Sequence, residues 1–295
     1  MIQRFEDFHP AFTFFYYMGV ILLLMMFQHP TILVIALLII LMIHFVEDRF
    51  QNLKRWSLLI ILSGVLIILL NPVFNQRGRI VLFIIGDHYI TLEAVLNGSV
   101  TALSIMAIIS IFVSYNEVMT PNKLLFLFSK LLPQFAVLLM LTLRFIPLMR
   151  RRLEEISAVQ YSKGIAVTDG NWRKKVKNGL LYIQVLVTYS LEEAIQTADS
   201  MNAREYGKGE RTTYDHFRFK KIDAVAFLWV GFLLIYCVIG RLYGFGVLTI
   251  YPMMDPIPLT GMEWCLAIGM FIFIAFPLVV KGGGRLKWRI LISKM

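Results

Sequence analysis

Side chains that could carry out chemistry are few in this 295-residue chain. His44 and His88 are separated by a long apolar run, and only Asp87, His88 and Glu93 gather at one place, near the start of another such run. A metal site needs three or four convergent donors, and the ordinary polarity of an exposed loop explains these three residues as well. We therefore predict neither a metal site nor a cofactor.

Motifs of nucleotide-hydrolysing and other hydrolytic enzymes are also missing. The sequence contains no P-loop lysine motif, no HExxH and no GxSxG, which hold phosphates, zinc and a nucleophilic serine respectively. Cys237 and Cys265 stand singly in apolar stretches, where a cysteine behaves as a small packing residue. We predict that the chain is not an enzyme and does not hydrolyse ATP.

The composition indicates a bilayer as the natural solvent. Hydrophobic residues make up 58% of the sequence and charged residues only 16%, and the mean hydropathy is +0.70, which is far from the balance of a soluble domain. The net charge of +10 would suit nucleic acid, but Lys and Arg also collect in loops that stay in the cytoplasm. We favour the second explanation and predict a multi-pass protein of the cell membrane with no nucleic-acid partner.

Six apolar runs are long enough, or nearly so, to cross about 30 Å of hydrocarbon as helices. They are 12–27, 31–46, 56–70, 92–114, 224–240 and 264–280. A seventh run, 135–149, is shorter, contains Arg144 and Pro147, and is followed directly by three arginines. Whether it crosses decides the topology of the first half of the chain.

The distribution of cations favours six crossings. If 135–149 does not cross, both termini and the segment 115–221 share one side with every Lys and Arg except Arg77, Arg79 and Arg241. Because cationic loops stay in the cytoplasm, we predict cytoplasmic termini and a segment 135–149 that lies along the inner membrane face. The predicted regions are a four-span bundle at 1–114, cytoplasmic and interfacial helices at 115–221, and two spans with a basic tail at 222–295.

The segment 115–221 has a helical pattern, so we predict an all-α polytopic membrane protein with about six transmembrane helices. In RRRLEEISAVQYSKG, Arg150 faces Glu154 and Arg151 faces Glu155 at i,i+4. A cation followed by Gly164 then predicts the end of this helix.

A second helix is predicted from about Trp172, and it too ends near a cation and a glycine, Arg204 and Gly207. Two such ends suit a docking element, since a small residue permits close approach and a cation donates to an acidic or carbonyl-rich groove. The alternative is that Lys163 and Arg204 only cap their own helices. Residue types alone leave both interpretations open.

The two helix ends resemble a known family. SAVQYSKG at 157–164 and ADSMNAREYGKGERT at 198–212 are similar to the two Ala-Arg-Gly signatures of the transmembrane T component of energy-coupling factor transporters. That component is the coupling subunit of a class of ABC transporters for vitamins and metal ions. ITLEAVLNG at 90–98, VMTPNKLL at 118–125 and LTLRFIP at 141–147 extend the resemblance to roughly 71–214.

The resemblance implies that six signature residues dock partner ATPases: Ser162, Lys163, Gly164, Ala203, Arg204 and Glu205. Three of them depart from the family pattern, and the first is Ser162, which replaces an alanine. Lys163 replaces an arginine, which keeps the cation but loses the planar fork, and Glu205 places a carboxylate where the family has glycine. These departures indicate that the two ATPase grooves differ, and they leave open whether the ATPases form a homodimer or a heterodimer.

The implied function is coupling rather than chemistry. Two cytoplasmic ABC-type ATPases would dock on the signatures, and a small substrate-binding membrane protein, the S component, would bind the membrane part for vitamin or metal-ion uptake. The alternatives are a stand-alone permease, which should carry ionisable residues within its spans, and a membrane-embedded enzyme with paired carboxylates or a metal set. His44 is nearly the only ionisable residue away from the span ends. The sequence names neither the solute nor the S component, nor whether the subunit is shared or dedicated.

Overall fold

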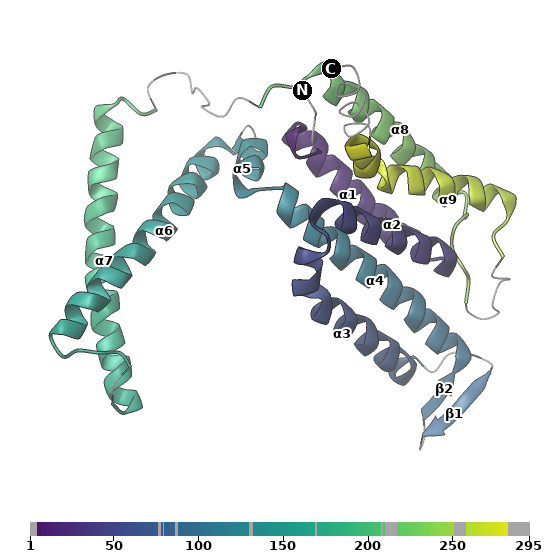
Figure 1. Cartoon of the computed structure of the whole chain (residues 1–295), viewed down its shortest axis with the longest axis horizontal. Helices are drawn as coiled ribbons and strands as arrows, with labels where there is room; N and C mark the ends of the chain where they lie inside the picture. Colours follow the sequence, from purple (N-terminus) through teal and green to yellow (C-terminus); the bar gives the residue numbers. More distant parts are fainter. Residues whose placement is uncertain are drawn as a thin grey trace, which may run out of the picture. The chain divides into compact units, whose positions relative to one another are not determined.

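Figure 1 shows a computed structural model of the chain, which describes residues 5–75, 78, 80–85, 88–129, 132–168, 170–207, 209, 217–250 and 258–282. Its elements in chain order are η1 (Phe5–Asp7), α1 (Pro10–Met26), α2 (Pro30–Asp48), α3 (Gln51–Phe74), β1 (Val81–Ile85), β2 (His88–Thr91), α4 (Leu92–Val118), α5 (Pro121–Ser129), α6 (Pro133–Ser162), α7 (Trp172–Ala203), α8 (Lys221–Leu242) and α9 (Gly261–Ile274). The described part of the chain is almost entirely helical, so the prediction of an all-α polytopic membrane protein is confirmed.

The chain forms two compact units. One comprises Met1–Pro121 together with Phe217–Met295, and we call it the bundle unit. The other is Asn122–His216, and we call it the helix-pair unit because α6 and α7 make up most of it.

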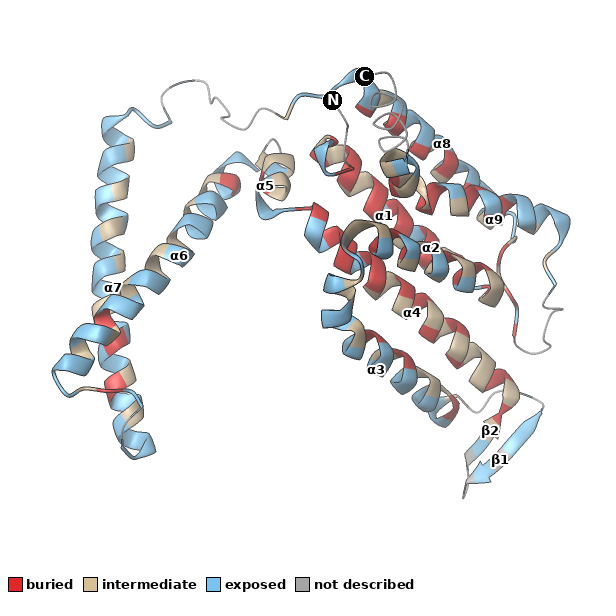
Figure 2. Cartoon of the chain, viewed as in Figure 1, coloured by how far each residue is buried: buried red, intermediate tan, exposed pale blue. Residues whose placement is uncertain are grey.

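Helix α1 forms the core of the bundle unit, where it contacts α4, α8 and α9 (Figure 2). Phe12, Tyr16, Val20 and Leu23 are completely buried along it. The Tyr16 hydroxyl donates a hydrogen bond of 2.7 Å to the carbonyl oxygen of Ile274. Because an unpaired polar group is costly in a membrane, such bonds fix how the helices pack.

Five single helices in the described ranges are long and apolar enough to cross a membrane: α2, α3, α4, α6 and α8. A sixth candidate is α9 with the helix Phe276–Gly282, from which it is bent by 54°. Helix α1 has 17 residues and rises by only about 26 Å. All six predicted crossings therefore lie in apolar helices of the bundle unit.

The seventh apolar run is not a separate element. Helix α6 continues through Pro147 to Ser162, so the run 135–149 and the charged stretch after it form one 30-residue helix. Its length and composition keep α6 among the candidate spans. The position of its apolar half along the inner membrane face stays a prediction.

The antiparallel hairpin of β1 and β2 was not predicted from the sequence. Ile84 pairs with Tyr89 and Ile85 with His88. A signal was available, because Gly86 and Asp87 separate two β-branched or aromatic runs, and such a dipeptide between apolar runs is typical of a tight hairpin turn. These two residues lie outside the described ranges.

Candidate functional site

The first signature lies at the carboxyl end of α6, as predicted. Gly164 has a left-handed backbone with φ of +76°. Its N–H donates to the carbonyl oxygen of Tyr161 at 3.0 Å, and the N–H of Ile165 donates to that of Gln160 at 2.9 Å. These two bonds define a Schellman motif, in which Lys163 is the C-cap residue.

Helix α7 ends in the same motif, two residues before the predicted glycine. The N–H of Glu205 donates to Asn202 and that of Tyr206 to Met201, each at 3.0 Å. The left-handed residue at the helix end is therefore Glu205, with φ of +57°, and Arg204 is the C-cap. The predicted end of this helix at 203–207 is confirmed, but the residue that closes the motif is Glu205 and not the predicted Gly207. At Glu205 a residue with a Cβ bears a conformational cost.

Lys163 and Arg204 thus occupy equivalent positions on two helices, and all six signature residues are exposed. Backbone N–H groups already bond the carbonyls of the last turns, so neither cationic side chain is required as a cap. In the described part of the chain, neither of the two cations forms an ion pair. The docking role of Lys163 and Arg204 stays a prediction.

The two helices cross (Figure 1), with contacts that include Met149 with Ser190, and polar bonds fix the loop that joins them. The buried Tyr182 hydroxyl donates to the carbonyl oxygen of Ile165 at 2.6 Å, and Asn178 Nδ2 donates to that of Ala166 at 2.8 Å. Sequence reasoning did not single out this pair. Its signal was an amide and a phenol four residues apart, on one face of a helix.

The signatures do not converge on one site. Tyr182 contacts the loop after the first signature, and from Tyr182 to Ala203 α7 rises by roughly 30 Å. A single side-chain-sized groove cannot hold both cations at that separation. The geometry suits two separate contact points.

Ion pairs on α6 follow the predicted pattern only in part. Arg150 Nε lies 3.6 Å from Glu154 Oε1, as predicted. Glu155 does not pair with Arg151; it accepts from Arg152 Nη1 at 2.9 Å. Arg152 also lies over the Tyr189 ring of α7, 5.8 Å from its centre. This contact across the helix pair explains why Glu155 pairs with Arg152 and not with Arg151.

The other candidate residues are structural where they are described. His44 is buried, and its Nε2 donates to the carbonyl oxygen of Ser110 at 2.8 Å. Glu93 is buried at the start of α4 and accepts from the N–H of Ile80. Asp87 and the His88 side chain lie outside the described residues. No group of three potential metal ligands occurs among the residues that are described.

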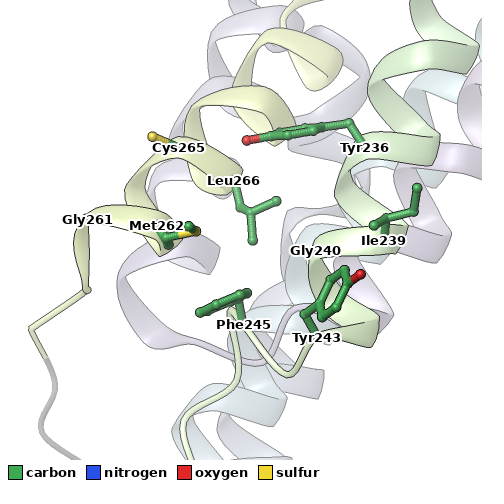
Figure 3. Close-up of a pocket in the computed structure, with 9 residues that line it drawn as sticks. All are labelled: Tyr236, Ile239, Gly240, Tyr243, Phe245, Gly261, Met262, Cys265 and Leu266. Atoms are coloured by element: carbon green, nitrogen blue, oxygen red, sulfur yellow. The ribbon is translucent and has the colours of Figure 1, made fainter.

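An apolar pocket of about 350 Å³ lies between α8 and α9 (Figure 3). Tyr236, Gly240, Cys265 and Leu266 are among its lining residues, and no charged side chain lines it. Its polar side-chain groups are the hydroxyls of Tyr236 and Tyr243 and the thiol of Cys265. The predicted packing role holds for the buried Cys237 but not for Cys265, which is exposed.

Comparisons with known proteins identify the family of the chain. The CbiQ family, described as cobalt transport protein, matches residues 6–214. The chain is 26% identical over 216 residues to an energy-coupling factor transporter transmembrane protein EcfT of Leuconostoc gelidum subsp. gasicomitatum, covering 68% of this chain and 79% of that one. It is 29% identical over 171 residues to the protein of the same name in Listeria innocua, covering 54% and 64% of the two chains.

The family match spans both signature ends and the first four helices of the bundle unit. The relatives carry the name of one transporter component. The chain therefore belongs to the CbiQ family and is a transmembrane component of the energy-coupling factor transporter type.

Proposed function

We propose that this chain couples two ABC-type ATPases to a substrate-binding membrane subunit, the S component. The observation that supports this most strongly is the pairing of two equivalent helix ends, each presenting an exposed C-cap cation. Since they lie roughly 30 Å apart along α7, each end serves a different ATPase subunit. The signature residues of the two ends are the docking residues.

The two contacts differ in chemistry. Arg204 offers a planar fork that can hold two acceptors, whereas Lys163 offers a point charge on a flexible stem. Glu205 adds a carboxylate beside Arg204, where Gly164 adds none beside Lys163. The second ATPase groove must therefore accept an acidic side chain as well as a cation.

The helix pair is suited to transmit movement. Tyr182 and Asn178 tie the loop after the first signature to α7, and Ser190 Oγ on α7 donates to Met149 Sδ on α6 at 3.0 Å. Closure of the ATPases upon ATP binding would change the separation of the two signature ends. Because these bonds hold α6 and α7 together, the helix pair would transmit the movement to the S component. Coupling requires such a two-state element, which both partners bias.

The membrane part would hold the S component, which selects a vitamin or a metal ion. Among the described residues no group of three potential metal ligands occurs, and the pocket between α8 and α9 has no charged side chain that would select a solute. Specificity therefore belongs to the other membrane subunit.

Affinity purification of the tagged chain from its native membrane tests this proposal. Two ABC-type ATPase subunits and one small membrane protein should copurify, and ATPase activity should disappear when the ATPases are removed. Recovery of the chain without any ATPase, or ATP hydrolysis by the chain alone in liposomes, would contradict the proposal.

A further inference from the structure

The β1–β2 hairpin presents apolar side chains that nothing in the described structure covers. Ile84 is 63% exposed and its cross-strand partner Tyr89 is 49% exposed. Directly paired residues of an antiparallel ribbon lie on the same face, so these two form one apolar patch. Val81 and Leu82 are also exposed (Figure 2).

The base of this ribbon is firmly built. The backbone N–H of Ile80 donates to Glu93 Oε1 at 3.2 Å, and the N–H of Leu92 donates to the carbonyl oxygen of Ile80 at 2.9 Å. Thr91 Oγ accepts from the N–H of Ala94 at 3.3 Å and so caps α4. Since β2 continues directly into α4, the ribbon has a fixed position at that helix end.

Two environments do not suit the ribbon. In water, a two-stranded hairpin is at best marginally stable, and the strand VLFII lacks the polar alternation of a half-solvated one. In the hydrocarbon core, the open edges of the ribbon would leave backbone groups without partners. The membrane interface suits both features, because water and head groups can bond the edges while apolar side chains dip inward.

The position of the ribbon agrees with this. Within helix α3, an apolar stretch from Trp56 to Phe74 comes directly after Lys54 and Arg55. This stretch rises by about 28 Å, which nearly matches the thickness of the hydrocarbon layer. Its surface is apolar and exposed up to Phe74, which is 81% exposed. Strand β2 contacts α3, so the exposed patch of the ribbon begins where this lipid-facing surface ends.

We propose that the hairpin is an interfacial anchor. It lies in the head-group layer at the amino-terminal end of α4, and the face with Ile84 and Tyr89 inserts into the boundary of the acyl chains. The ligand is bilayer lipid. This inference depends on membrane insertion of the bundle unit and not on ATPase docking.

Site-specific fluorescence tests the anchor in the full chain reconstituted in vesicles. A Cys265→Ser background leaves only the buried Cys237, and Ile84→Cys or Tyr89→Cys then carries an environment-sensitive dye. Leu62→Cys on the exposed face of α3 is the hydrocarbon control, and Lys174→Cys on α7 is the water control. Quenchers are iodide on both sides of the vesicle and lipids with a nitroxide near the ester or near the methyl end of the chain.

The interfacial position predicts that the ester-end nitroxide quenches the dye at both hairpin positions about twofold or more better than the methyl-end nitroxide. Iodide should quench it clearly less than at Lys174→Cys. Iodide quenching equal to the water control, or strongest quenching by the methyl-end nitroxide as at Leu62→Cys, would overturn the proposal. So would protection from all quenchers, because a protein partner would then cover the patch.

Discussion

Replacing Glu205 with glycine should strengthen the end of α7, and replacing Gly164 with alanine should weaken the end of α6. Both residues hold the left-handed position of a Schellman motif. That conformation costs a residue with a Cβ about 1–2 kcal/mol. Glycine avoids this cost. However, glycine also loses more conformational freedom than other residues when the helix end forms, and this loss offsets about 0.5–1 kcal/mol of the gain.

The net effect is therefore about 0.5–1 kcal/mol, which stabilises the helix end in Glu205→Gly and destabilises it in Gly164→Ala. This corresponds to about a two- to fivefold change in the opening equilibrium of the helix end. Crowding contributes nothing at position 164, because a Cβ there would meet no atom within 4 Å. At position 164 the expected effect is therefore one of backbone conformation.

The opening equilibrium of each helix end can be measured by hydrogen exchange of the amide that closes the motif. This amide is Tyr206 for α7 and Ile165 for α6. Exchange at Tyr206 should slow in Glu205→Gly, and exchange at Ile165 should quicken in Gly164→Ala. Glu205→Gln is the matched control, because it removes the charge and keeps the Cβ. Equal slowing in Glu205→Gln, or no slowing in Glu205→Gly, would refute this account of the helix end.

Three other predictions concern packing, the loop and topology. Gly19→Ala should destabilise the bundle unit by about 1–3 kcal/mol, because the new Cβ would lie 2.6 Å from Leu234 and 2.7 Å from Phe273. Gly231→Ala is the control, because a Cβ there meets open space. Thermal unfolding in detergent should show a lower midpoint temperature only for Gly19→Ala. Tyr182→Phe removes the bond to Ile165 and should cost about 1 kcal/mol, which faster exchange in the loop 163–171 would report; unchanged exchange would show that the bond contributes nothing. Cysteines introduced at Lys123 and Lys177 should both be shielded from an impermeant thiol reagent outside intact cells, and labelling at 123 but not at 177 would mean that α6 crosses the membrane.

Much of the fold followed from local sequence patterns. Apolar runs predicted the helices of the bundle unit because in lipid each spanning segment must satisfy its backbone bonds internally. The stop at Gly164 followed because glycine takes the left-handed conformation without strain. The second stop was misplaced, since Glu205 adopts that conformation despite its residue type.

The rest depends on contacts between distant residues. Pairing of Glu155 with Arg152 rather than Arg151 accompanies the contact between Arg152 and Tyr189 on another helix. The bonds from Tyr182 and Asn178 to the loop likewise require the fold of the helix pair. The hairpin was missed although Gly86 and Asp87 signalled a turn, because its apolar strand resembles part of a buried helix in sequence alone.

Copurification of the ATPases with charge variants tests the central claim most directly. Loss of a desolvated interfacial cation typically costs on the order of 2–5 kcal/mol, whereas loss of a helix-end charge costs about 0.3–1 kcal/mol. Arg204→Ala should therefore reduce ATPase affinity more than about tenfold, Lys163→Ala less so, and reversal to glutamate should be worse at both. Lys174→Glu, which reverses an exposed charge that belongs to neither signature, is the control and should bind normally. If Arg204→Glu retained full copurification and full uptake, the docking role of the second signature would be contradicted.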